Sequence, residues 1–455
     1  MQDVQQRGLT LFARNQSFSR RLLLGGAAGL AATAALTGCG PDDAGAPVDL
    51  GSEEEGNLVV WGGVAAERGP GALVEAFMKK YPKIKVDYVS FVNNEQGILK
   101  LDTSLQGGVP IDVFFSYGTA DVVRRSQAGL ALDLTDLAAQ DERAKIFVEG
   151  DPISTKVNDR LYSIPTTHYP EFVLVNEDAI TKAGINIPDD WTVDDYHAIA
   201  KELAGTGMVA GAYNMPRLAS TTLGGNYIYK EGGKESNLDH PLFRAELENF
   251  LAMQDDKAIF AQKKITAEKI DSYPQNYFLN SSYGMFLNGT SSLRFVRDLK
   301  NYPHTFRTTF RPYPAPTKGA TYWNPGVRGD DIQISAKSQY AKAAWTFVQF
   351  WLGEGAPLVA PAGKVSPFEV DNPSEAMIAN LMGEDREQLF DIDSFKRVVF
   401  AKEPKLSVRS ITTAYNEIAS LKSKIEAQVR MGTMPIDTAV AEMKKQADEA
   451  IAKAQ

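Results

Sequence analysis

Aromatic and uncharged polar residues follow several strands that the sequence predicts, and this combination suits the binding of a small polar ligand. Tyr117 follows the apolar run 111–115, and Asn288 follows the predicted strand 283–287. In sheets of alternating strands and helices, ligands bind outside the carboxyl ends of the strands. A tyrosine or tryptophan ring can stack on a sugar while its polar tip makes a hydrogen bond. We therefore predict a carbohydrate site in which Tyr117, Tyr169 and Trp323 share one cleft. The candidate ligand-binding residues are Gly63, Glu67, Arg68, Ser116, Tyr117, His168, Tyr169, Asn214, Asn288, Thr290, Ser291, Trp323, Arg328 and Asp330.

Several of these candidates have a second interpretation. Tyr117 is either a stacking platform for a sugar ring or a rim residue packed on a helix. Trp323 is followed by the turn-forming residues Asn-Pro-Gly and not by the regularly spaced apolar residues of a buried helix or strand, which favours a ligand-facing ring. Arg328 and Asp330 suit sugar hydroxyls or, equally, a salt bridge near a hinge. Because Arg68 and Arg328 are positively charged, an anionic ligand is an alternative to a neutral one.

Catalytic and metal-binding motifs are missing from the sequence. The four histidines are scattered without metal-ligand spacing, and there is no GxxxxGK[ST], GxSxG or HExxH motif. The single cysteine, Cys39, excludes an intramolecular disulfide and a cysteine-based zinc site. We predict no cofactor, no metal and no enzymatic activity. A secreted carbohydrate-active enzyme is the rival hypothesis, because carboxylate pairs that cleave glycosides meet only in the folded chain.

Apolar runs that alternate with helical periods predict an α/β fold. Strands are expected at 58–61, 84–89 and 111–115, with helices over 72–78 and 98–105 between them. This order is typical of a βαβ, mostly parallel sheet.

The segment between Pro165 and Pro170 predicts a passage from one lobe to another. Both prolines favour an extended backbone, and the buried run 172–175 follows as a strand. A return passage is expected at 323–331. We predict two lobes, each a mostly parallel sheet flanked by helices, joined by a hinge of two or three crossing segments. Lobe 1 is expected to comprise 57–166 and 330–365, and lobe 2 to comprise 168–328 and 368–455.

The amino terminus has the features of an export signal. Arg20-Arg21 precedes an apolar run over 22–36, which is too short and too rich in Gly and Ala for a stable transmembrane span. Residues 1–38 are predicted to be a signal peptide. The arginine pair resembles a twin-arginine signal, and a general-secretion signal is the alternative. Leu36-Thr37-Gly38-Cys39 resembles a lipobox, in which Cys39 receives the lipid; the alternative is an incidental cysteine.

The next segment, 39–56, is rich in Gly, Pro, Asp and Glu and is predicted to be a flexible acidic tether. The net charge of the chain is −9, and removal of residues 1–38 leaves 44 basic and 56 acidic residues, a net charge of −12. Nucleic-acid binding needs a basic surface, so this composition argues against it. Hydrophobic residues make up 44% of the chain and charged residues 23%, as in an ordinary globular protein.

Blocks in consistent order over nearly all of 57–455 resemble the family-1 extracellular solute-binding proteins of ABC importers, the maltose-binding-protein-like group. The blocks are NLVVWGG, EAFMKKYPKIKVDYV, GGVPIDVFFSYG, AGLALDLTDL, LYSIPTTHYPEFVLVNEDAITKAGI and FLNSSYGMFLNGTSS. Members that bind maltodextrins often place tryptophan after the glycine of the last block. This chain has Thr290 and Ser291 there, so one stacking platform is missing.

The resemblance implies a fold like that of the type II periplasmic binding proteins and a carrier that closes on its ligand by hinge motion. It further implies delivery of a mono- or oligosaccharide to an ABC permease, and a monomer held at the outer face of the cytoplasmic membrane by lipid on Cys39. A ligand-presenting sensor subunit for a membrane signalling receptor is the alternative from another functional class.

Overall fold

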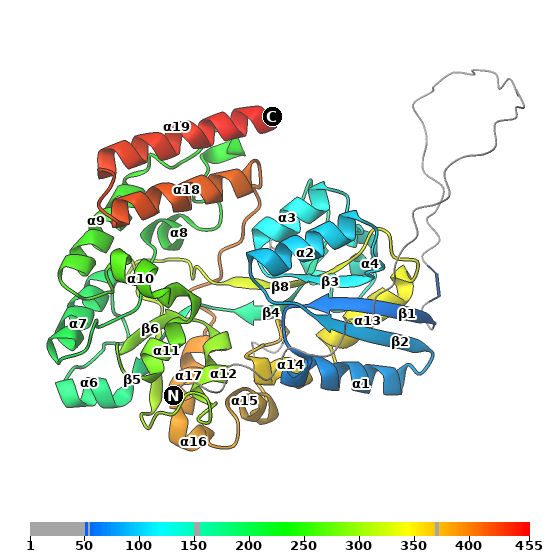
Figure 1. Ribbon diagram of the computed structural model, residues 1–455, viewed down its shortest axis with the longest axis horizontal. Coiled ribbons are helices and arrows are strands. Elements are labelled where there is room, and N and C mark those ends of the chain that lie inside the picture. Colours follow the sequence, from blue (N-terminus) through cyan, green and yellow to red (C-terminus); the bar gives the residue numbers. More distant parts are fainter. Residues whose placement is uncertain (1–50, 53–54, 150–154, 369–372) are drawn as a thin grey trace, which may run out of the picture. The chain divides into compact units, whose positions relative to one another are not determined.

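The computed structural model describes residues 51–52, 55–149, 155–368 and 373–455 (Figure 1). The predicted signal peptide, Cys39 and most of the predicted tether lie outside these residues. Residues 49–455 form one compact unit. In the described part of the chain, no helix is long and apolar enough to cross a membrane.

The first sheet has five strands in the order β2-β1-β3-β8-β4. β1 pairs in parallel with both β2 and β3, whereas β8 runs antiparallel to both β3 and β4. The second sheet has three strands in the order β6-β5-β7, and both of its pairs are antiparallel. The strands are β1 (Gly56–Gly62), β2 (Ile84–Ser90), β3 (Val113–Ser116), β4 (Ile164–Tyr169), β5 (Phe172–Asn176), β6 (Met285–Asn288), β7 (Thr308–Pro312) and β8 (Val327–Ile334).

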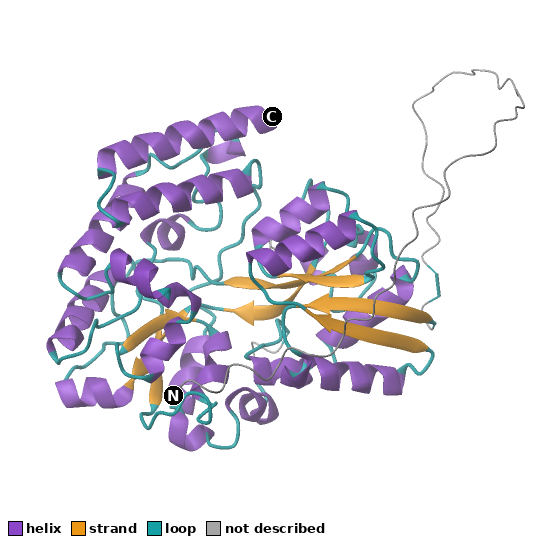
Figure 2. Cartoon of the chain, viewed as in Figure 1, coloured by secondary structure: helices purple, strands orange, loops and turns teal. Residues whose placement is uncertain are grey.

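The predicted α/β architecture of two sheets flanked by helices is confirmed (Figure 2). The expectation that each sheet is mostly parallel is wrong. Parallel neighbours need a crossover of a dozen or more residues, which the chain has between β1 and β2. Only Pro170 and Glu171 separate β4 from β5, so the chain passes from one sheet to the other there without a helical crossover.

Successive side chains along the strands of the first sheet point to opposite faces, and each face packs against its own hydrophobic core. Leu58 and Val60 of β1 pack with Phe77 of α1 (Pro70–Lys80) and with α13 (Ala341–Leu352). Trp61 packs on the opposite side, with Leu101 of α2 (Glu95–Gln106). Figure 1 shows α2 and α3 (Thr119–Gln127) on one side of this sheet and α1 on the other.

The second sheet is buried in the same alternating way. Phe172 and Leu174 of β5 face one core, and Val173 and Val175 face another. A further helical cluster is built by α8 (Leu218–Leu223), α9 (Pro241–Asp255), α18 (Tyr415–Arg430) and α19 (Ile436–Ala454). The remaining helices are α4 (Thr135–Ala139), α5 (Ile146–Glu149), α6 (Glu177–Ala183), α7 (Val193–Gly205), α10 (Gln262–Glu268), α11 (Pro274–Leu279), α12 (Leu293–Val296), α14 (Ala356–Val359), α15 (Glu375–Met382), α16 (Arg386–Leu389) and α17 (Ile392–Val399). The 3₁₀ turns are η1 (Ala66–Arg68), η2 (Glu231–Gly233), η3 (Ile270–Ser272), η4 (Thr290–Ser292) and η5 (Ala360–Ala362).

The chain passes between the two sheets at Pro170-Glu171 and again at 313–326, between β7 and β8. A third segment lies beside β4, because the His168 N–H donates a 2.8 Å hydrogen bond to the Val365 carbonyl. The second passage overlaps the predicted return passage 323–331 only at 323–326, because 327–331 belong to β8. The lobe boundaries themselves stay a prediction.

Candidate ligand site

A cavity of about 880 Å³, called here the main cavity, lies beside the paired strands β4 and β8. Cavities of about 300–1,000 Å³ are typical of small-molecule sites. Its walls come from the ends of β4 and β7, the start of β8, and loops at 223–226, 322–324 and 400–408. Three of the predicted ligand residues line it: His168, Trp323 and Arg328.

Trp323 contributes an aromatic surface to this cavity, with 40% of the residue exposed. Its backbone N–H donates to the Thr221 carbonyl at 2.8 Å, which fixes the loop that carries it. Gly224 has φ +77°, and a Cβ there would lie 3.1 Å from the indole Nε1. Glycine is therefore needed at 224 both for its backbone conformation and for the close approach of the ring.

His168 and Arg328 are direct partners in the antiparallel pairing of β4 and β8. Burial, reinforced by the positive charge of Arg328, lowers the pKa of His168 to about 4, so the imidazole is neutral at pH 7. Burial also lowers the pKa of Arg328. The His168 Nδ1 and the Arg328 Nε are both enclosed without a hydrogen-bond partner in the described chain.

The acidic residues on the walls of the main cavity are Glu171, Asp189 and Glu403. Glu171 forms an ion pair with Arg217 at 2.5 Å, and both Asp189 and Glu403 are exposed. The Arg217 backbone is held in turn by the buried Tyr313, whose hydroxyl accepts the Arg217 N–H. Glu171 is therefore already neutralised by a fixed partner.

A second group of residues gathers around Asp330, and we call it the Asp330 cluster. It consists of the predicted residues Gly63, Tyr117, Tyr169, Asn288, Ser291 and Asp330, together with Arg294 and Lys364, which were not predicted. Asp330 forms an ion pair with Lys364, and both line a small cavity of about 10 Å³ together with Tyr117. The Tyr117 hydroxyl accepts the Gly63 N–H at 2.5 Å. Burial and the Asp330 charge raise the pKa of Tyr117 well above its usual value.

Tyr169, the last residue of β4, contacts the residues of this cluster that come from the end of β6 and the turn after it. Its hydroxyl shares a hydrogen bond with the Ser291 hydroxyl and donates to Asn288 Oδ1 at 3.3 Å. A Cβ on Gly289 would lie 2.2 Å from the tyrosine ring, so only glycine fits there. Burial raises the pKa of Tyr169 to about 12, and the charge of Asp330 adds to this rise.

The cluster also holds a second enclosed arginine. Burial and then the positive charge of Arg68 lower the pKa of Arg294, whose Nε has no partner in the described chain. Arg68 itself is exposed in η1, beside the exposed Glu67. The Asp330 cluster thus combines polar groups that follow β1, β3 and β6, and so it brings together residues from both sheets.

The expectation that Tyr117, Tyr169 and Trp323 share one cleft is wrong in this structure. Trp323 lines the main cavity, Tyr117 lines the small cavity, and Tyr169 lines neither of these two. For Tyr169 the reason is the alternation of side chains along β4: neighbouring residues of a strand point to opposite faces, so Tyr169 does not line the main cavity with His168.

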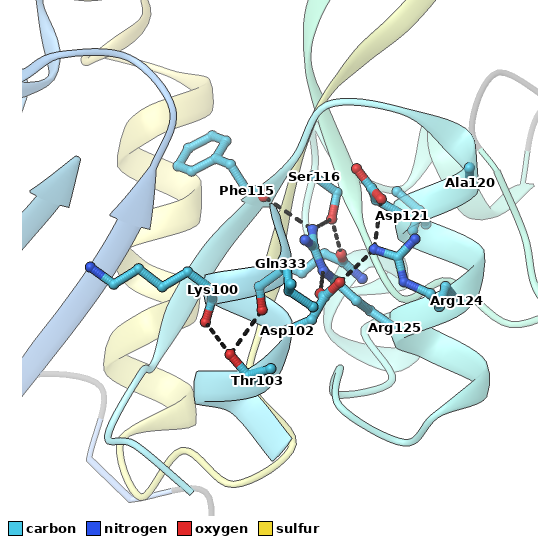
Figure 3. Close-up of polar contacts among 12 residues, drawn as sticks. Lys100, Asp102, Thr103, Phe115, Ser116, Ala120, Asp121, Arg124, Arg125 and Gln333 are labelled. Atoms are coloured by element: carbon cyan, nitrogen blue, oxygen red, sulfur yellow. Dashed lines mark hydrogen bonds and ion pairs between the residues drawn. The ribbon is translucent and has the colours of Figure 1, made fainter. Parts of the chain in front are cut away.

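Two predicted ligand residues are structural instead. Ser116 is fully buried; it accepts a 2.6 Å hydrogen bond from Arg125 and donates one of 2.6 Å to Gln333 Oε1 (Figure 3). Thr290 is also fully buried, and its hydroxyl donates to the Gly363 carbonyl at 2.9 Å. Both hydroxyls are enclosed and already bonded, so we do not retain them as ligand contacts.

Asn214 lines neither cavity. Its Nδ2 donates to the Leu287 carbonyl at 3.4 Å, close to Asn288, while its Oδ1 is buried without a partner in the described chain. Sequence reasoning missed the wall formed by 400–408, because this segment has no period and reads as an ordinary loop. It also missed Asn324, whose position in an Asn-Pro-Gly run suggested only a turn.

The described residues contain no group of three or more His, Cys, Asp or Glu side chains placed to hold a metal ion. The available chemistry is hydrogen bonding, aromatic stacking and charge. That combination suits reversible binding of a polar solute.

Residues 67–356 match the family model of the bacterial extracellular solute-binding proteins. Among solved structures, an ABC substrate-binding protein of Listeria monocytogenes in complex with cycloalternan aligns with a TM-score of 0.71 and 18% identity, covering 88% of this chain and 99% of that one. The GacH receptor of Streptomyces glaucescens, solved unliganded and with acarbose, aligns with a TM-score of 0.68 and 19% identity, covering 88% and 100%.

An uncharacterized lipoprotein encoded in the oleD 5′ region of Streptomyces antibioticus is 24% identical over 334 residues, which is 70% of each chain. The two solved structures share the fold described above, with two sheets flanked by helices. The family match covers more than half of the sequence and includes most of the first sheet and all of the second. The chain belongs to the bacterial extracellular solute-binding protein family.

Proposed function

We propose that this protein is a lipid-anchored carrier that captures a carbohydrate by hinge closure and delivers it to an ABC-type membrane permease. The observation that carries the proposal is the main cavity. It is large enough for a small polar ligand, has an exposed indole on one wall, and adjoins two strands that lie at passages between the sheets.

Closure would follow from contacts made on both sides of those passages. The proposed lobes are 57–166 with 330–365, and 168–328 with 368–455. The Asp330 cluster supports the idea, since Tyr117 follows a strand of the first sheet and Ser291 follows one of the second. A ligand that bridges such groups stabilises the closed form only by its extra affinity for that form.

Two further points support a carbohydrate as the solute. The main cavity combines the rings of Trp323 and Tyr322 with the polar side chains of His168 and Arg328, and aromatic rings beside polar groups suit sugar rings. The structures from L. monocytogenes and S. glaucescens hold cycloalternan and acarbose, respectively. The retained contacts are Gly63, Glu67, Arg68, Tyr117, His168, Tyr169, Asn214, Asn288, Ser291, Trp323, Arg328 and Asp330.

A melting-temperature screen of the purified protein tests this function. Binding to the folded state raises the melting temperature by mass action, so at least one saccharide should raise it and amino acids and polyamines should not. Small-angle scattering with the active sugar should then show a smaller radius of gyration. If only non-saccharide solutes raise the melting temperature, the proposed ligand class is wrong.

Membrane attachment would come from lipid on Cys39, and the S. antibioticus relative, which is named a lipoprotein, supports this. Labelled fatty acid should be incorporated into the wild-type protein and not into Cys39→Ser, which should appear in the medium. Export by the twin-arginine route is tested by Arg20→Lys combined with Arg21→Lys, which should retain the precursor inside the cell.

We also propose that the protein carries its solute unchanged. Incubation of the purified protein with oligosaccharides that raise its melting temperature should release no smaller product. Appearance of cleaved sugars at a rate that increases with protein concentration would instead support a secreted enzyme.

A further inference from the structure

Arg328 is a cation on the wall of the main cavity that has no compensating anion. Among the described residues, its guanidinium makes no ion pair and no hydrogen bond, and its Nε is enclosed. The buried Arg125, by contrast, is paired with Asp102 at 2.7 Å. Arg294, whose Nε is also enclosed, makes no ion pair among the described residues, but it lies in the Asp330 cluster, where the charge of Asp330 acts on it.

The residues around Arg328 do not offer a substitute partner. His168, directly across the strand pair, is neutral at pH 7 and its charged form would repel the arginine. Glu171 is occupied by Arg217, and the other two acidic residues on the cavity walls are exposed. Arg397 and Lys405 line the same cavity and add positive charge.

This local excess of positive charge contrasts with the chain as a whole, whose net charge is −9. Partial burial of an unpaired guanidinium is unfavourable, because the group loses hydration without gaining a partner. An anionic group would remove that cost when it binds. The planar fork of an arginine matches a carboxylate or a phosphate with two parallel hydrogen bonds.

We propose that the solute bound in the main cavity is a sugar that carries a negatively charged group, a carboxylate or a phosphate, and that Arg328 binds this group. The inference rests on the proposed function, since it specifies which class of carbohydrate the carrier takes. Trp323, on the same cavity wall, provides the ring surface for the sugar, so one ligand can satisfy both residues.

The experiment compares matched neutral and charged sugars on the purified full-length protein in detergent, by calorimetric titration. The pairs are glucose with glucuronate and galactose with galacturonate, and digalacturonate and glucose 6-phosphate complete the set. We expect at least one charged sugar to bind ten times more tightly than its neutral counterpart. The carboxylate and phosphate arms identify which anionic group is recognised.

Two substitutions at 328 and one elsewhere assign the effect. Arg328→Gln should lose at least tenfold in affinity for the charged sugar, and Arg328→Lys should recover part of that loss. Arg143→Gln removes the same charge from an exposed position outside the cavity and should change affinity less than twofold. The melting temperature of each variant without ligand checks that it is folded.

The outcomes separate this inference from the proposed function. Binding of neutral sugars as tightly as charged ones overturns the inference and leaves the carbohydrate carrier intact. An unchanged preference in Arg328→Gln also overturns it. If no sugar of either kind binds, the proposed function fails and this inference fails with it.

Discussion

The side-chain amide of Asn324 is hydrogen bonded to both backbone groups of Glu171. Its Oδ1 accepts the Glu171 N–H at 3.0 Å, and its Nδ2 donates to the Glu171 carbonyl at 2.8 Å. The same Oδ1 accepts the Gly326 N–H at 2.8 Å. Glu171 lies between β4 and β5, and Asn324 lies between β7 and β8. One buried side chain therefore joins the two passages between the sheets.

Asn324→Ala should lower the free energy of unfolding by about 3 kcal/mol, because buried polar groups left without a partner cost about 1–3 kcal/mol each. Urea denaturation followed by circular dichroism measures the change. Asn301→Ala is the matched control: this asparagine is exposed, its side chain bonds only Asp298, and its loss should cost under about 0.5 kcal/mol. Equal stability of Asn324→Ala and the wild type would show that this contact does not hold the passages together.

Trp323→Ala should weaken sugar binding about tenfold, which corresponds to about 1.4 kcal/mol, without loss of stability. The ring is partly exposed, so its removal leaves no cavity in the core. Gly224→Ala should weaken binding in the same direction, since a methyl group at 224 would displace the indole and strain a backbone with positive φ. Calorimetric titration with the sugar that raises the melting temperature measures both.

Tyr273→Ala is the control for this pair, because Tyr273 is an exposed aromatic residue that does not line the main cavity. Its substitution should leave affinity unchanged. Full affinity in Trp323→Ala would place the sugar elsewhere, with the Asp330 cluster as the next candidate.

Local sequence patterns predicted β1, β2 and β3 of the first sheet, because each is a short apolar or alternating run and the helices between them keep one apolar face. The predicted strand 84–89 is β2 within one residue, and the predicted helix 72–78 lies within α1. The direction of β8 could not be predicted, since strand pairing depends on residues more than 200 positions apart, such as Phe115 and Ile332.

The candidate site was predicted less completely than the fold, for the same physical reason. Ser116 and Thr290 have residue types that suit ligand binding, and both occur next to strand ends. Burial decides between a ligand contact and an internal bond, and burial depends on distant partners such as Arg125 and Gly363. Trp323 was predicted to face a ligand, and it does line a cavity, because turn residues beside it keep it out of the core.

Asp102 is the acidic residue of the buried network around Ser116, and its substitution should lower the stability of the protein strongly. Asp102 forms ion pairs with Arg125 at 2.7 Å and with Arg124 at 2.6 Å, and Arg125 is 1% exposed (Figure 3). Removing one partner of a buried pair costs about 3–5 kcal/mol, because the other charge stays buried and unpaired. Asp102→Asn should therefore lower the free energy of unfolding by about 3 kcal/mol in urea denaturation.

Glu142→Gln is the matched control for Asp102→Asn. Glu142 also forms an ion pair, with Lys145 at 2.8 Å, but its side chain is 91% exposed. Exposed pairs contribute little, so the change should be under about 1 kcal/mol. A similarly small effect for Asp102→Asn would mean that the bonds from Arg125 to Ser116 and to the Phe115 carbonyl are sufficient to hold this arginine.

Two buried groups of the crossing strands should make opposite contributions to the pH dependence of stability. Burial, with a smaller contribution from the Asp330 charge, raises the pKa of Asp331 from 3.8 to about 7. Between these values the unfolded chain releases the proton and the folded chain keeps it. Asp331 therefore adds to the free energy of unfolding below about pH 4, and this added stability is lost as pH rises toward 7.

His168 acts in the opposite direction, because its pKa falls from 6.5 to about 4 in the folded protein. The neutral imidazole adds to the free energy of unfolding above pH 6.5, and this added stability is lost as pH falls toward 4. The free energy of unfolding changes by at most about 1.4 kcal/mol per pH unit for each group, so the two effects offset one another over this window.

Relative to the wild type, Asp331→Asn should gain stability as pH rises, and His168→Gln should lose it. Urea denaturation between about pH 4.5 and 6.5 at fixed ionic strength measures both differences, and the double variant should show little trend. Differences that stay constant with pH in both single variants would show that neither group titrates differently in the folded and unfolded chains.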